Sequence, residues 1–160
     1  MSRSLIAAVL SAVALTAAAC GSDGRSRQDE VADRGAKVMP FDLERTTHRF
    51  TPNDNGLVQT VVADDADDAH HVDLVRAHLR AEAQRFQRGD FDDPAQIHGD
   101  EMPGLARLRA HGGAVSVVYS DIDAGGKLVY ASEDAELVRA LHEWGEAQTS
   151  DHGDHAHEGS

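Results

Sequence analysis

Histidine is the residue type in this sequence best suited to chemistry, because 10 of the 160 residues are histidine. Neutral imidazole binds borderline divalent metals such as zinc and copper, and near neutral pH it also serves as a general acid or base. The C-terminal tail interleaves three imidazoles with three carboxylates: Asp151, His152, Asp154, His155, His157 and Glu158. This mixture predicts metal capture by the tail, and the alternative is a solvated polar terminus.

Three histidines in the predicted folded part are expected to meet. His48 lies two residues before Phe50 on a predicted strand, so the two side chains share a face. His78 and His142 lie at matching edges of the apolar stripes of two predicted helices. Packed on one sheet, these positions predict a grouping of three imidazoles that holds a metal with an open coordination position. For each one, the alternative is an ordinary hydrogen-bonded core histidine.

Two methionines extend the candidate ligand set. His98 and Met102 occur in the segment His-Gly-Asp-Glu-Met-Pro-Gly, whose glycine and proline favour a loop, and Met39 opens the segment Met-Pro-Phe. A thioether suits Cu(I), whereas histidine with carboxylate suits zinc; the alternative for both methionines is a core-filling role. The candidate ligands for copper or zinc are Met39, His48, His78, His98, Met102, His142 and His152.

The elements that position these residues follow from the spacing of apolar residues. Residues 46–50 and 57–62 flank the turn sequence TPNDNG, and residues 115–119 and 127–131 flank DIDAGG, so each pair predicts a β-hairpin. Apolar residues three and four apart predict helices over 72–86 and 137–148, and the insert 89–113 predicts short helical turns. The expected inward strand residues are Phe50, Val58, Val62, Val117, Tyr119, Leu128 and Tyr130.

This order predicts an α+β two-layer sandwich, in which two long helices cover one face of a four-stranded antiparallel sheet. The order of elements is ββα, insert, ββα. Both long helices carry the pattern His-x-x-x-Glu-Ala-Gln, beginning at His78 and His142. An internal duplication explains this echo, and so does the common composition of two alanine-rich helices.

The N-terminal segment predicts export. Residues 1–19 carry Arg3, an apolar run over 5–15 and three alanines before Cys20, which is typical of a secretory signal and too short for a transmembrane helix. Cys20 is the only cysteine, and its place after the small residues predicts a bacterial lipoprotein acylated there, with palmitate or a similar chain. The alternative is ordinary cleavage after Ala19, which leaves a free thiol.

The expected organisation follows. Residues 1–19 form the signal, 20–37 a flexible tether, 38–150 the α+β domain and 151–160 a disordered His/Asp-rich tail. The protein is expected to be anchored in the cell membrane through the lipid on Cys20, facing outside the cytoplasm.

The net charge and the absence of common catalytic motifs exclude several classes of function. A formal charge of −13 argues against nucleic acid as a partner. The sequence has no Gly-x-Ser-x-Gly elbow, Walker loop, dinucleotide glycine fingerprint, Cys-x-x-Cys or His-Glu-x-x-His motif. We therefore expect a non-enzymatic lipoprotein that binds a transition metal. One alternative is a small enzyme, with His48, His78 or His142 as general acid or base beside a nucleophile such as Ser116 or Thr46. The other alternative is a structural or partner-binding lipoprotein.

Three phrases carry a family resemblance: VMPFDLERTTHRF, LVRAHLRAEAQRFQRGDFDDPAQIHGDEMPGL and ALHEWGEAQTSDHG. They span most of residues 38–153 and resemble small exported bacterial proteins of unestablished activity with the pattern MPF, H, IHG, MPG and DHG. Some of these proteins carry the label aspartate carbamoyltransferase. A carbamoyltransferase catalytic chain is longer and cytoplasmic, and it binds carbamoyl phosphate with a Ser-Thr-Arg-Thr loop that this sequence lacks. The resemblance implies the same seven histidine and methionine positions.

Overall fold

A single antiparallel core sheet with one added strand organises the protein. The computed structural model describes residues 26–153 and 156–158, and its strand order is β3-β4-β2-β1-β5. The strands are β1 (Thr46–Asn53), β2 (Gly56–Ala63), β3 (Ser116–Ile122), β4 (Gly125–Ala131) and β5 (Ala156–Glu158). The first four pair antiparallel, which confirms the predicted sheet and the α+β class, whereas β5 pairs parallel to β1.

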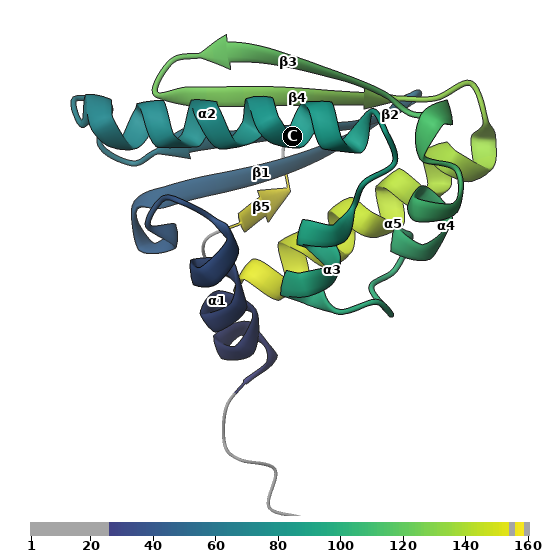
Figure 1. The fold of residues 1–160 in the computed structure, drawn as a ribbon, viewed down its shortest axis with the longest axis horizontal. Coiled ribbons are helices and arrows are strands. Elements are labelled where there is room, and N and C mark those ends of the chain that lie inside the picture. Colours follow the sequence, from purple (N-terminus) through teal and green to yellow (C-terminus); the bar gives the residue numbers. More distant parts are fainter. Residues whose placement is uncertain (1–25, 154–155, 159–160) are drawn as a thin grey trace, which may run out of the picture.

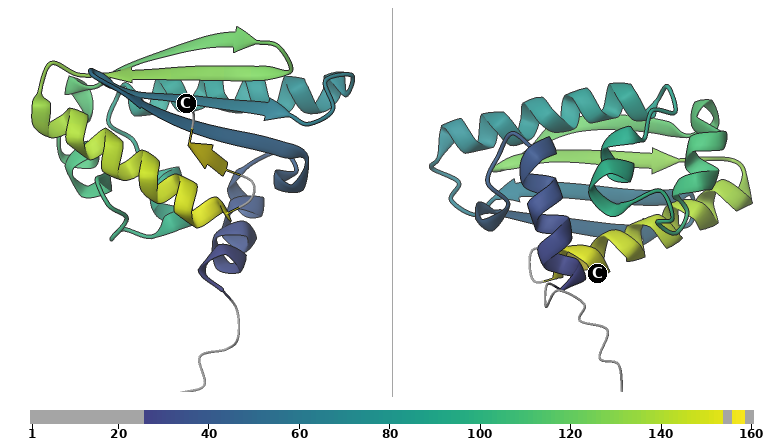
Figure 2. Two further views of the ribbon diagram at one scale, coloured as in Figure 1. Left: turned by 180° about the vertical axis from the view of Figure 1, so that it is seen from behind. Right: turned by 60° about the horizontal axis from the view of Figure 1, so that its bottom comes forward.

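The helices lie on one face of the sheet (Figures 1 and 2). They are α1 (Arg27–Val38), α2 (Ala69–Phe86), α3 (Asp92–His98), α4 (Leu105–Ala110) and α5 (Ala135–His152), with short 3₁₀ turns at Leu43–Arg45 and Gly112–Ala114. The helix that follows each hairpin covers the other hairpin: α2 lies on β3 and β4, and α5 lies on β1 and β2. Two related ββα units would give this arrangement.

The register of β2 differs from the sequence-based expectation. Phe50 pairs with Gln59, so Leu57 and Val61 share the inner face with Phe50 and are fully buried. Val58 and Val62, which were expected to face inward, are only partly buried and lie on the opposite face. Residues of a strand alternate in side, so a continuous apolar run cannot show which half of its members points inward.

An aromatic cluster fills the core beneath the sheet. Trp144 of α5 packs edge-on against Phe50, Phe86, Phe91 and Tyr130, with ring centres 5.4 to 6.3 Å apart. A Cβ on Gly145 would lie 2.8 Å from a methyl carbon of Leu57, so a side chain there would push α5 away from β2. Glycine at this position allows the close approach that seats Trp144.

The segment expected to be a flexible tether, 20–37, contains a helix over its described part. α1 begins at a capping box, in which the Ser26 hydroxyl accepts from the Asp29 backbone N–H and the Asp29 carboxylate accepts from the Ser26 N–H. Only Val31 and Gly35 of α1 are buried, so the helix lacks the apolar period that sequence analysis relies on. Polar contacts hold it instead: Arg27 donates to the His98 carbonyl at 2.6 Å, at the C-terminal end of α3.

The described part of the C-terminal tail is also more ordered than expected. Asp151 and His152 belong to the last turn of α5, and Ala156, in β5, is buried against β1. No apolar pattern predicts this order, because the described part of the tail is held by a parallel strand pairing and by the burial of one histidine. The described part of the chain has no helix long and apolar enough to cross a membrane. The predicted signal and Cys20 lie outside the described residues.

Candidate functional site

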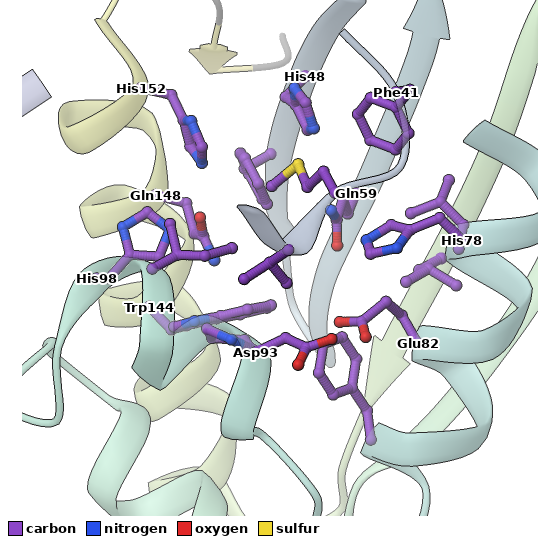
Figure 3. A pocket seen from close by; sticks show the side chains of 18 residues that line it. Phe41, His48, Gln59, His78, Glu82, Asp93, His98, Trp144, Gln148 and His152 are labelled. Atoms are coloured by element: carbon purple, nitrogen blue, oxygen red, sulfur yellow. The ribbon is translucent and has the colours of Figure 1, made fainter. Parts of the chain in front are cut away.

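A small cavity lies between the sheet and the helices, and Figure 3 shows the side chains that line it. Its volume is about 40 Å³. A buried water needs roughly 10 to 15 Å³, so the cavity has room for a few water molecules. The polar residues of its wall come from five elements and are His48, Gln59, His78, Glu82, Asp93, His98, Gln148 and His152.

Regular spacing explains why these side chains point inward. His48 alternates with buried Phe50 on β1. On α2, His78 and Glu82 are four residues apart, and on α5 Gln148 and His152 are four apart. Residues at this spacing share one face of a helix, so each pair lines the cavity together.

Three imidazoles gather at one end of the cavity; we call His48, His98 and His152 the histidine trio. The ring centres of His48 and His152 are 5.4 Å apart, and those of His98 and His152 are 5.1 Å apart. The His48 and His152 rings are parallel within 2°, whereas the His98 ring is nearly perpendicular to that of His152. Three separate elements, β1, α3 and α5, therefore bring these side chains to the same end of the cavity (Figure 3).

The His98 ring is held by a carboxylate. Its Nδ1 lies 2.8 Å from Asp151 Oδ2, and Arg27 Nη2 donates to the same oxygen at 2.7 Å. Burial lowers the pKa of His98 more than the Asp151 carboxylate raises it, so the ring is neutral at neutral pH. Burial raises the pKa of Asp151, but hydrogen bonds from Arg27 and His98 outweigh it and keep the pKa below its usual range. This carboxylate fixes the ring orientation, and a side-chain hydrogen bond with Gln148 also holds the ring.

His78 lies apart from the trio. The Phe41 ring packs against His78 with ring centres 5.4 Å apart and against His48 at 6.1 Å, so an apolar ring stands between the two imidazoles. Burial lowers the pKa of His78 against the opposing effect of Asp93. In Figure 3, His78 lies on the side of the cavity that carries Glu82.

Two carboxyl groups, those of Glu82 and Asp93, face each other at the end of the cavity opposite the histidine trio (Figure 3). We call these two residues the carboxyl pair. Glu82 is only 6% exposed. Burial raises its pKa to about 8, and the hydrogen bond with Asp93 adds to the rise. Arg85 forms an ion pair with Asp93 and lies 3.7 Å from Glu82 Oε1.

Five of the seven residues proposed from the sequence as metal ligands line the cavity: Met39, His48, His78, His98 and His152. His142 does not, because it lies over the β1–β2 turn, where its Nε2 is 2.9 Å from both the Asn53 and Gly56 carbonyl oxygens. The geometry makes it a structural histidine of the hairpin. Met102 is a buried core residue that borders a separate outer groove.

Four polar residues of the cavity were not predicted from the sequence: Gln59, Glu82, Asp93 and Gln148. One signal was present: Glu82 falls among the apolar positions of α2, between Leu79 and Phe86. A charged residue in such a stripe indicates either a paired core charge or a functional group. Asp93 lies in the first turn of α3, whose N-cap is Phe91, and its carboxylate faces Glu82 and pairs with Arg85.

The nucleophiles considered for an enzyme lie outside the cavity. Thr46 donates its hydroxyl to backbone carbonyls of the 3₁₀ turn, and Ser116 is exposed at the start of β3. Neither side chain lines the cavity. Over residues 26–153 and 156–158, no three His, Cys, Asp or Glu side chains are already arranged around one point as metal ligands.

No family model, no curated protein and no solved structure matches the chain. The family resemblance of the phrases in residues 38–153 therefore stays a prediction.

Proposed function

We propose that the protein is an exported lipoprotein, anchored to the cell membrane through Cys20, that binds a transition metal ion, copper or zinc, at the histidine trio without catalysing a reaction. The observation that carries the proposal is the spacing of the three imidazoles. Two rings bound to one tetrahedral ion at metal–nitrogen distances of about 2.0 to 2.1 Å have centres about 5 Å apart. The two separations in the trio, 5.1 and 5.4 Å, agree with this.

Metal binding at the trio requires the His48 and His152 rings to change orientation. The lone pairs of His48 and His152 lie in parallel planes, so they do not converge on one point as the rings stand. The Cβ–ring torsion of histidine is intrinsically broad, and the cavity beside the two buried rings gives them space to turn. The fold supplies the spacing, and the ion would supply the energy for reorientation.

Charge and neighbouring groups also favour this proposal. A metal ligand must be a neutral imidazole, and burial keeps His98 neutral. The Asp151 carboxylate on Nδ1 of His98 is the partner that metal-bound histidines commonly have. Met39 lines the same cavity, so a thioether is close by for Cu(I).

The size of the cavity favours an ion over an organic substrate. Pockets for organic ligands typically measure 300 to 1,000 Å³. A cavity of about 40 Å³ takes an ion with its water but only the smallest substrates. The alternative of a small enzyme would rest on Glu82 and His78 as acid and base, and it would require the cavity to open.

Metal binding is tested on untagged protein that begins at residue 20 and keeps its tail, because His152 belongs to the fold. We expect one zinc or copper ion per chain by elemental analysis and titration. His98→Ala and His152→Ala should weaken binding at least 100-fold. His111→Ala, which removes an exposed histidine, should bind as wild type does.

The double variant His155→Ala/His157→Ala distinguishes metal binding by the tail from metal binding at the histidine trio. It should still bind one metal ion per chain. Absence of binding at micromolar free zinc and copper, or binding that survives loss of both His98 and His152, would refute the metal proposal. Anchoring is tested separately: the full precursor should incorporate labelled palmitate and sediment with membranes, and Cys20→Ser should do neither.

A further inference from the structure

Among the described residues that line the cavity, Glu82 and Asp93 are the only acidic ones. Both carboxyl groups are shielded from water, with side chains 8% exposed for Glu82 and 15% for Asp93. Asp93 forms an ion pair with Arg85, and Arg85 is itself shared with Asp90, whose Oδ2 lies 2.9 Å from Nε. The Arg85 guanidinium is therefore shared among three carboxyl groups, of which Asp90 also has Arg88 nearby.

The contact between the two carboxyl groups requires a proton. The Glu82 and Asp93 carboxyl groups face each other in Figure 3, and a hydrogen bond between them is one of the causes that raise the pKa of Glu82. An ionised carboxylate only accepts hydrogen bonds, so two ionised groups cannot form this bond with each other. One of the two must carry a proton, and the more deeply buried Glu82, whose pKa is raised to about 8, is the group that carries it.

A cation bound in the same cavity would favour the ionised form of Glu82 over the protonated form. The histidine trio consists of neutral ligands when it binds, so it adds no negative charge to balance a divalent ion. In a poorly hydrated cavity the attraction between opposite charges is strong, and it favours the ionised form of any carboxyl group nearby. The titratable and charged groups that face Glu82 are His78 and Arg85 of α2, Asp90 and Asp93 beyond it, and Tyr130 of β4, with the trio across the cavity.

We infer that the carboxyl pair is a proton-exchange site, which holds one proton when the trio is empty and releases it when a divalent cation binds there. In this step the O–H bond of the Glu82 carboxyl breaks, its electron pair stays on the carboxylate oxygen and the proton leaves to solvent. The cation adds two positive charges, and the lost proton removes one. This inference rests on the proposed metal function and makes that function proton-coupled, so cation affinity rises with pH.

Zinc titration of the untagged chain in buffers of different ionisation enthalpy measures the protons released per bound ion. At about pH 6.5 the wild type should release about one proton more than Glu82→Gln, because the amide has no acidic proton and the histidine ligands are common to both proteins. The zinc affinity of the wild type should rise up to tenfold more per pH unit than that of Glu82→Gln. Glu133→Gln, which changes an exposed glutamate, should behave as wild type does.

Infrared difference spectroscopy on the wild type makes the test independent of whether Glu82→Gln folds. Zinc addition should remove the C=O absorption of a protonated carboxyl group and add carboxylate absorption. Equal proton release by wild type and Glu82→Gln, or an unchanged carboxyl band on zinc binding, would overturn the inference and leave the metal proposal standing. If the wild type binds no zinc, the metal proposal fails and the inference fails with it.

Discussion

Replacing Glu82 by glutamine should change how the stability of the metal-free protein depends on pH. Glu82 is 6% exposed, and its pKa is raised from 4.5 to about 8 in the folded state. The folded state therefore holds a proton that the unfolded chain releases between these two values. This contribution to stability is fully present below pH 4.5 and is lost as the pH rises through about 8.

The size of the effect follows from these two pKa values. Between about pH 5 and pH 7.5, linkage predicts that Glu82 alone lowers the free energy of unfolding by about 3 kcal/mol. Burial lowers the pKa of His78 and His98, so their contributions change in the opposite direction and are gained as the pH rises toward 6.5. Because both proteins contain these histidines, the difference between wild type and Glu82→Gln isolates the glutamate.

Urea unfolding with EDTA present, at about pH 5 and pH 7.5, measures this difference. Relative to Glu82→Gln, the wild type should lose about 3 kcal/mol of stability over this interval, whereas Glu133→Gln should follow the wild type. The difference in free energy of unfolding between wild type and Glu82→Gln could instead be the same at both pH values. That result would show that Glu82 is ionised in the folded protein. The account of the carboxyl pair would then be wrong.

Three further substitutions test other parts of the structure. His142→Ala removes the side chain that bridges the Asn53 and Gly56 carbonyls, so it should lower the free energy of unfolding by about 1 to 2 kcal/mol in urea without affecting zinc binding; a loss of zinc binding in a folded variant would contradict its structural role. Asp151→Asn removes the carboxylate that orients His98, so zinc affinity should fall about 10- to 100-fold while the circular dichroism spectrum is kept; unchanged affinity would exclude this orienting role. Gly145→Val places a side chain where Leu57 lies 2.8 Å from a built Cβ, so it should destabilise the protein by about 1 to 3 kcal/mol; a neutral effect on thermal unfolding would show that α5 can shift away from β2.

Part of the site could be read from periodicity. The alternation on β1 correctly placed His48 beside Phe50 on the inner face, and the short helices of the insert were expected near His98. The edge of an apolar stripe is a weaker guide, as the two helices show. His78 lines the cavity, whereas the matching His142 lies over the β1–β2 turn. The reason is that the face of α5 that points to the cavity carries residues 144, 148 and 152.

Local patterns failed where polar groups are stabilised by distant partners. α1 buries Val31 and Gly35 but is held by Arg27, whose partners, the His98 carbonyl and Asp151, lie far along the chain. His152 was assigned to a disordered tail because its neighbours in sequence are polar. Its burial depends on His48 and His98, which other elements supply.

The sequence by itself determined the two hairpins, the long helices and the α+β class, because periods of two and of three to four apolar residues are local properties that burial enforces. It also identified histidine as the chemically informative residue type. Only the tertiary structure decided which histidines meet, and that Glu82 and Asp93 share a cavity with them. Distances between side chains on separate elements depend on helix placement and strand register, which no local pattern specifies.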